Sequence, residues 1–148
     1  MYGKLRLKNQ LCYRLYTASR LFTQAYEPHL RPLGITYTQL LVLMVLWEKD
    51  EQPVNKIGER LLLGINTTSP LIKRMEGMGL LSRHDSEDDK RKQIVFLTEK
   101  GKALKDKAKN LPDLVLKDVE ETGMARETIE ALVPALDEMI EKMGNKKK

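Results

Sequence analysis

The only cysteine of the chain, Cys12, is the residue best suited to react with an oxidant. A thiolate attacks a peroxide oxygen and becomes a sulfenic acid, provided that the oxidant can reach it. With one cysteine, an intramolecular disulfide is impossible. The sulfenic acid would then be capped by a small external thiol, oxidised further or joined to another chain. Periodicity alone favours a different role, that of a small hydrophobic residue on an apolar helical face.

A second group of side chains, between residues 66 and 74, has the types that a DNA groove binds. The candidates for contacts with base edges are Asn66, Thr67, Thr68 and Ser69. Lys73 and Arg74 follow one turn later as candidates for phosphate contacts. Leu71, Met75 and Met78 recur at helical spacing and predict one apolar face. An ordinary amphipathic helix has the same pattern, so this stretch alone leaves both interpretations open.

Composition sets the class of protein. The chain has 148 residues, 41% hydrophobic and 32% charged, which is typical of one globular domain over residues 1–148. The net charge of +5 allows a nucleic-acid partner without requiring one. No apolar run approaches the roughly 18 residues of a membrane span, and no secretory signal is visible, so we expect a cytoplasmic protein with no membrane partner. Two histidines are too few to suggest a metal, and no cofactor is predicted.

Four helices are predicted before residue 80. The first runs from about Leu5 to Tyr26, with Cys12 in the middle of its apolar face, and ends or bends at Glu27–Pro28. A capping box, Thr36-x-x-Gln39, opens a central helix that is apolar on every face. A short third helix spans about 54–61. The fourth begins at the small hydroxyl residues, with Pro70 in its first turn, and ends near residue 79.

The third and fourth helices form a helix-turn-helix, and a β-hairpin follows directly. Residues 80–84 and 93–97 are strand-like, and a charged tip joins them. Such a hairpin is a wing, in which Arg91 is the candidate for the minor groove and Asp89 steadies it. Arg83 is a further candidate for a phosphate contact. A solvated charged loop is the alternative for the tip taken alone.

The end helices carry wide apolar faces that this core cannot cover. Thr98 caps a long helix that reaches Val119 and kinks at Pro112, and a last helix spans about 125–143 with an irregularity at Pro134. A frayed basic tail, residues 144–148, follows. The predicted fold is mainly α with a small β wing (α+β): a winged helix-turn-helix core at about 36–98, with dimerisation helices at about 5–30 and 99–144. A symmetric homodimer would bury these faces and present two reading helices to a pseudo-palindromic operator in double-stranded DNA.

The chain resembles the MarR family of winged-helix transcriptional regulators along nearly its whole length. More narrowly, it is similar to the one-cysteine, peroxide-sensing branch (OhrR-like, MgrA–SarZ-like). The motifs that carry the resemblance are Asn9-Gln10-Leu11-Cys12, Leu15-Tyr16, Tyr26-x-Pro28, Ile35-Thr36-Tyr37-x-Gln39, Leu46-Trp47-Glu48, Pro70-Leu71-Ile72-Lys73-Arg74-Met75-Glu76, Ser86-Glu87-Asp88-Asp89-x-Arg91 and Leu97-Thr98-Glu99-x-Gly101. The chain departs from this branch in the residues before Pro70. The branch usually has Asp-Ser-Gly-Thr there, whereas this chain has Gly64-Ile65-Asn66-Thr67.

The resemblance implies that oxidation of Cys12 releases the DNA, and that Tyr26 and Tyr37 hydrogen-bond its sulfur across the dimer. Lys8 lies one helical turn before the thiol. Cys12 and Tyr26 are 14 positions apart on one helix, about 21 Å, so they cannot meet within one chain. If they meet, the tyrosine comes from the partner.

We therefore expect a dimeric, sequence-specific DNA-binding regulator, with repression favoured, whose operator is released when an organic hydroperoxide or similar oxidant, or a small-thiol adduct, modifies Cys12. A MarR-type regulator released by a small aromatic ligand, with Cys12 structural, is the nearest alternative. A thiol peroxidase is a less favoured alternative, because this chain has no resolving cysteine. A helical protein-binding adaptor is another, but it leaves the wing and its Arg91 unexplained. The chain is thus not expected to be an enzyme.

Overall fold

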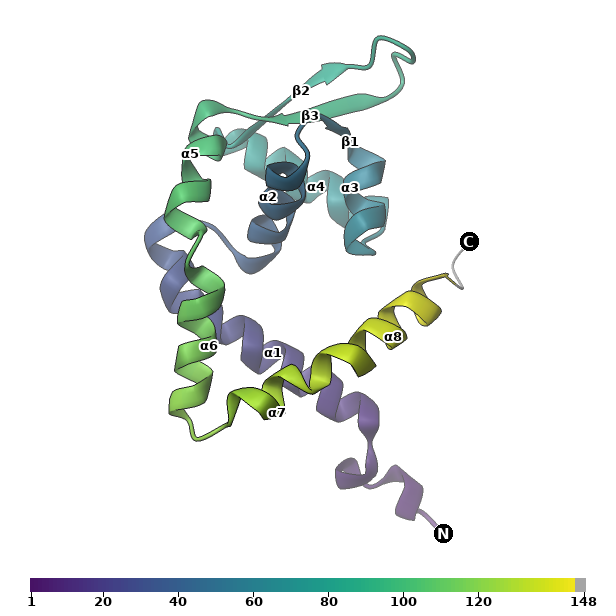
Figure 1. The fold of residues 1–148 in the computed structure, drawn as a ribbon. Coiled ribbons are helices and arrows are strands. Elements are labelled where there is room, and N and C mark those ends of the chain that lie inside the picture. Colours follow the sequence, from purple (N-terminus) through teal and green to yellow (C-terminus); the bar gives the residue numbers. More distant parts are fainter. Residues whose placement is uncertain (146–148) are drawn as a thin grey trace.

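The computed structural model describes residues 1–145 and is built mainly of helices (Figure 1). In chain order the α-helices are α1 (Leu11–Leu30), α2 (Tyr37–Glu48), α3 (Val54–Leu61), α4 (Ile65–Gly77), α5 (Glu99–Ala108), α6 (Leu111–Glu121), α7 (Arg126–Glu130) and α8 (Leu132–Asn145). Short 3-10 helices lie at Gly3–Leu5, Leu7–Asn9 and Arg31–Leu33. The strands are β1 (Gln52–Pro53), β2 (Leu81–Asp85) and β3 (Gln93–Leu97). The predicted fold class, mainly α with a small β wing, is confirmed.

The core forms around α2, which is apolar on every face because other helices surround it. Leu40, Val42 and Leu43 are fully buried, and each such side chain contributes about 1.5–3 kcal/mol when it leaves water. The predicted capping box is confirmed: Thr36 Oγ1 accepts from the Gln39 backbone N–H (3.3 Å), and Gln39 Oε1 accepts from the Thr36 N–H (3.0 Å). The helix therefore begins at the expected residue.

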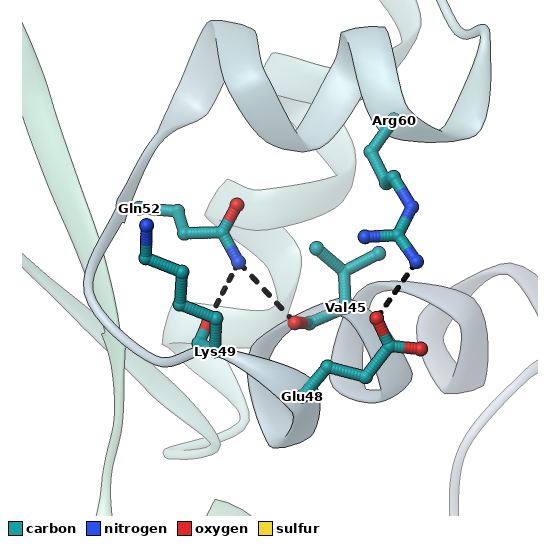
Figure 2. Close-up of polar contacts among 5 residues, drawn as sticks. All are labelled: Val45, Glu48, Lys49, Gln52 and Arg60. Atoms are coloured by element: carbon teal, nitrogen blue, oxygen red, sulfur yellow. Dashed lines mark hydrogen bonds and ion pairs between the residues drawn. The ribbon is translucent and has the colours of Figure 1, made fainter.

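Side chains also fix the end of α2, and they connect it to α3 (Figure 2). The Gln52 side-chain amide donates to the carbonyl oxygens of Val45, in the last turn of the helix, and of Lys49, its C-cap. The Arg60 guanidinium of α3 donates to the Glu48 carboxylate of α2 at 2.7 Å. The third helix thus stands in a defined position against the central one.

The helix-turn-helix, α3 and α4, packs closely because Gly58 has no side chain. A Cβ at Gly58 would lie 2.8 Å from Thr68 Oγ1 and 2.9 Å from the Leu63 carbonyl oxygen. Thr68 itself is fully buried, and its hydroxyl donates to the Gly64 carbonyl oxygen at 3.0 Å. The turn between the two helices is therefore defined by this contact, and the predicted short third helix is confirmed.

The wing is a three-stranded antiparallel sheet in the order β1-β3-β2. The two predicted strands pair with Leu81 opposite Leu97 and Asp85 opposite Gln93, and their hairpin extends past the helices (Figure 1). The sequence did not reveal β1, because two residues that include a proline leave no alternating pattern. Asp50 Oδ1 accepts from the Leu97 backbone N–H at 2.9 Å, which holds the end of β3 beside the end of α2.

The end segments differ from the prediction in four places. The first helix starts at Leu11, not Leu5, and it continues through Pro28 to Leu30. The predicted long helix after Thr98 is two helices, α5 and α6, with Pro112 in the first turn of α6. The last helix also divides, into α7 and α8. Of the predicted tail, Gly144 and Asn145 belong to α8, and residues 146–148 lie outside the described residues.

The arrangement of α1, α6 and α8 leaves apolar side chains uncovered. Figure 1 shows α1 and α6 running side by side away from the wing, and α8 returning across α1. On α8, Val133, Ile140 and Met143 are 52%, 57% and 62% exposed. Within residues 1–145 no single helix has the length and apolarity to cross a membrane, although residues 11–33 and 37–48 pass that test as a pair bent by 75°.

The close approach of α3 and α4 gives a stability prediction. Gly58→Ala is expected to lower the free energy of unfolding by about 1–3 kcal/mol, because its methyl group would overlap Thr68 and the Leu63 carbonyl. Gly77→Ala is the control, since a Cβ there meets nothing within 4 Å and alanine favours the helix. Urea unfolding at one fixed protein concentration measures both. Equal midpoints for Gly58→Ala and the wild type would contradict the packing described.

Candidate DNA interface and thiol site

Four of the five residues from Ile65 to Ser69 have side chains that reach solvent. Asn66 and Thr67 are exposed, Ser69 is half-buried, and Lys73 and Arg74 are exposed further along α4. The prediction that Thr68 reads a base edge is wrong, because its side chain is buried against α3 and bonded to the backbone of the turn. The candidate base-reading set is thereby reduced to three polar side chains.

The start of α4 also differs from the prediction. The helix begins at Ile65, with Gly64 as its N-cap, so Pro70 is the sixth helical residue and not part of the first turn. Among the described residues, no side chain caps this helix end. The small hydroxyl residues therefore belong to the first turns of the helix, where their side chains are not used as caps.

The wing tip holds Arg91 where little of the molecule covers it. Its side chain is 92% exposed, and its Nε lies 3.3 Å from Asp89 Oδ1. The same oxygen accepts from the Arg91 backbone N–H at 3.0 Å. Asp89 therefore orders both the turn and the guanidinium, in the geometry that the sequence suggested. An ion pair this exposed contributes little to the stability of the fold.

Arg83 is already engaged within the chain. Its Nε donates to Glu76 Oε1 at 2.7 Å, and both side chains are about three-quarters buried. This pair joins β2 to the last turns of α4. The ion pair with Glu76 was not predicted, because no pattern in the sequence relates a residue of α4 to one of the following strand. A phosphate contact by Arg83 stays a prediction.

The thiol and the two tyrosines lie in different regions of the chain. Cys12 is exposed and is the second residue of α1, because the helix starts at Leu11; the sequence had placed the thiol in the middle of an apolar face of a helix that began at Leu5. Lys8 lies in a separate 3-10 helix, so it is not one α-helical turn away. The rings of Tyr26 and Tyr37 meet edge-on, with centroids 5.0 Å apart. The straight span of α1 separates this pair from Cys12 of the same chain by about 21 Å.

The environment of the tyrosine pair favours the neutral phenol. Burial raises the pKa of Tyr26, and the neighbouring Tyr37 raises it further. Burial also raises the pKa of Tyr37. A tyrosine hydroxyl is protonated at neutral pH and can donate a hydrogen bond to an anion such as a thiolate, and burial of this pair extends that protonated state to higher pH. Within residues 1–145 no cluster of histidine, cysteine and carboxylate side chains could hold a metal ion.

Comparisons with known proteins agree with this geometry. A model of the transcriptional regulator SarA/Rot family matches residues 24–108. The chain is 41% identical over 145 residues to the organic hydroperoxide resistance transcriptional regulator of Bacillus subtilis. This alignment covers 98% of this chain and 97% of the Bacillus subtilis protein. The chain is also 41% identical over 112 residues to the HTH-type transcriptional regulator MgrA of Staphylococcus aureus, 74% of this chain and 75% of that one.

Solved structures of AbfR, a Staphylococcus epidermidis protein, have the same fold. The structure of reduced AbfR bound to DNA matches with a TM-score of 0.71 and 34% sequence identity, over 95% of each chain. The structure of overoxidised AbfR bound to DNA also has a TM-score of 0.71, with 36% sequence identity over 95% of this chain and 96% of that one. The fold and site define a winged-helix transcriptional regulator. More narrowly, the chain belongs to the MarR family, in the branch of the organic hydroperoxide resistance regulators.

The raised pKa values give a prediction about alkaline stability. A raised pKa means that the unfolded chain loses these phenolic protons first, so their stabilisation is complete below about pH 10 and is lost as the pH rises through the folded values. Tyr26→Phe and Tyr37→Phe should therefore lose less free energy of unfolding than the wild type as the pH rises above about 10. Tyr2→Phe, which changes a phenol that is 73% exposed, should follow the wild type. Parallel curves for all four proteins would contradict burial of the pair.

Proposed function

We propose that this protein is a cytoplasmic, homodimeric transcriptional repressor that binds a pseudo-palindromic operator and releases it when Cys12 is oxidised by an organic hydroperoxide or a similar oxidant. The observation that carries the DNA-binding part is the combination of α4, with Asn66, Thr67 and Ser69 accessible, and a wing that ends on Arg91, 92% exposed. Base-edge and minor-groove contacts need such accessible side chains. Lys73 and Arg74 would contact phosphates, and Arg83 would do so beside Glu76.

The dimer is supported by the uncovered apolar faces of the end segments. They include Leu5, Leu7, Leu11, Leu132, Val133, Leu136, Ile140 and Met143. A second copy would remove these side chains from water and set two α4 helices about one helical turn of DNA apart. We assign residues 36–98 to the winged core and the segments 5–30 and 99–144 to dimerisation, within one domain of residues 1–148.

The sensor is proposed to form between protomers, with Cys12 of one chain beside Tyr26 and Tyr37 of the other. The two half-buried phenols meet edge-on, so their hydroxyls lie close enough together to donate to one thiolate. Peroxide oxygen transfer gives the sulfenic acid and an alcohol, and a small thiol then condenses with it to a mixed disulfide and water. Because overoxidised AbfR has been solved bound to DNA, we favour the mixed disulfide as the state that releases the operator.

Two other functions fit fewer observations. A regulator released by an aromatic ligand would use a cavity such as the one of about 460 Å³ beside Tyr37, lined by Thr23, Glu27 and Arg31 among others, and would leave Cys12 without a role. A thiol peroxidase with its own resolving cysteine does not fit a chain that has one cysteine, and a peroxidase that used an external thiol would consume peroxide over many turnovers and leave the wing and Arg91 without a role. We therefore propose no enzymatic activity.

The test of oxidation sensing compares operator release by the wild type and Cys12→Ser. With DNA from upstream of its own gene, cumene hydroperoxide plus a small thiol is expected to release the wild type, whereas Cys12→Ser should stay bound because it cannot form a sulfenic acid. Fluorescence anisotropy measures both. Release of Cys12→Ser at the same peroxide dose would refute thiol sensing, and release of both by an aromatic acid would favour the ligand alternative.

Arg91→Ala is expected to weaken operator binding by about 1–3 kcal/mol, the energy of one good groove contact. The matched control is Lys109→Ala, which removes another exposed and carboxylate-paired cation from the segment between α5 and α6. Titrations of both variants at one fixed salt concentration measure the loss. If the two variants lose the same affinity, Arg91 contributes only charge and has no groove contact.

A further inference from the structure

Ile65 stands at the start of α4 although nothing local favours it there. Its side chain is 56% exposed, while the apolar packing of this helix is made by Leu71, Ile72 and Met75. Acidic or hydroxyl side chains stabilise the first turn of a helix, whereas a β-branched aliphatic residue slightly lowers the helix propensity. Neither helix formation nor the core of the chain therefore accounts for an exposed isoleucine at this position.

We propose that Ile65 is a specificity-determining residue that contacts the 5-methyl group of a thymine in the major groove. The inference rests on the proposed role of α4 as the DNA-reading helix. In such helices the N-terminal residues contact base edges, and thymine is the one base that presents a methyl group there. An exposed aliphatic side chain gains affinity from that methyl group, because both surfaces leave water together.

The next residue supports the same base pair. Asn66 is exposed beside Ile65, and a side-chain amide can pair with the N6 and N7 positions of adenine. An A·T pair offers the amide and the methyl partners side by side in the major groove. The first two residues of α4 therefore favour A·T over G·C at one position of each half-site. A polar side chain in place of Ile65 would bind DNA without this requirement.

The experiment removes the methyl group and nothing else. The reduced, full-length protein is used to select duplexes from a randomised pool, and the selected duplex is resynthesised with each thymine in turn replaced by uracil. One thymine per half-site is expected to matter, with uracil weakening wild-type binding about fourfold, the value of one methyl group in an apolar contact. A thymine in the fixed sequence that flanks the selected duplex serves as the control.

The variants connect the effect to the side chain. Ile65→Ser should bind the thymine and uracil duplexes equally, and Ile65→Val should keep the wild-type preference. Ile65→Ala replaces the serine variant if that one does not fold. The inference is overturned if no uracil replacement weakens the wild type, or if the preference persists in the folded serine or alanine variant. A selection that enriches no duplex would instead overturn the proposed DNA-binding function, and the inference with it.

Discussion

The rigid geometry of α1 is the constraint on which the proposed switch depends. An α-helix rises 1.5 Å per residue, so Cys12 and Tyr26 of one chain stay about 21 Å apart whatever the rest of the molecule does. The thiol is exposed at one end of this helix, and the tyrosine pair lies at the other. A sensor that combines them must be assembled from two protomers. Dimerisation would then create the sensor and the paired DNA-reading helices by the same contact.

The structure also offers a short physical route from the sensor to the DNA. Tyr37 is the first residue of α2, and this buried helix ends where Arg60 of α3 holds Glu48 (Figure 2). The third helix then packs on α4 without a gap, because Gly58 allows Thr68 to approach. A close-packed core transmits a displacement instead of absorbing it. An adduct beside Tyr37 would thus displace α4, and both copies of α4 must fit the operator together.

Local signals predicted the winged core well, because its decisive features are short-range. The capping box at Thr36 and the apolar run that follows specify α2, and the two strand-like segments pair as the hairpin of the wing. The failures have tertiary causes. Thr68 is of a residue type that can contact a base edge. It is buried instead, because Gly58 has no side chain and leaves room for it between α3 and α4. The beginning of α1 and the division of the long C-terminal helix depend on backbone geometry that apolar spacing does not encode. The cross-chain pairing of Cys12 with tyrosines came from a family resemblance, not from spacing.

The central claim, that the thiol of one protomer is activated by the tyrosines of the other, is tested most directly with a mixed dimer. One protomer carries Cys12→Ser, and the other carries Tyr26→Phe and Tyr37→Phe, so the single thiol and the intact tyrosines are on different chains. The rate of thiol oxidation by cumene hydroperoxide is measured per thiol and compared with that of the wild type and of the Tyr26→Phe, Tyr37→Phe homodimer. The account predicts the wild-type rate in the mixed dimer and a slower rate in that homodimer. A mixed dimer as slow as the homodimer, or a homodimer as fast as the wild type, would contradict it.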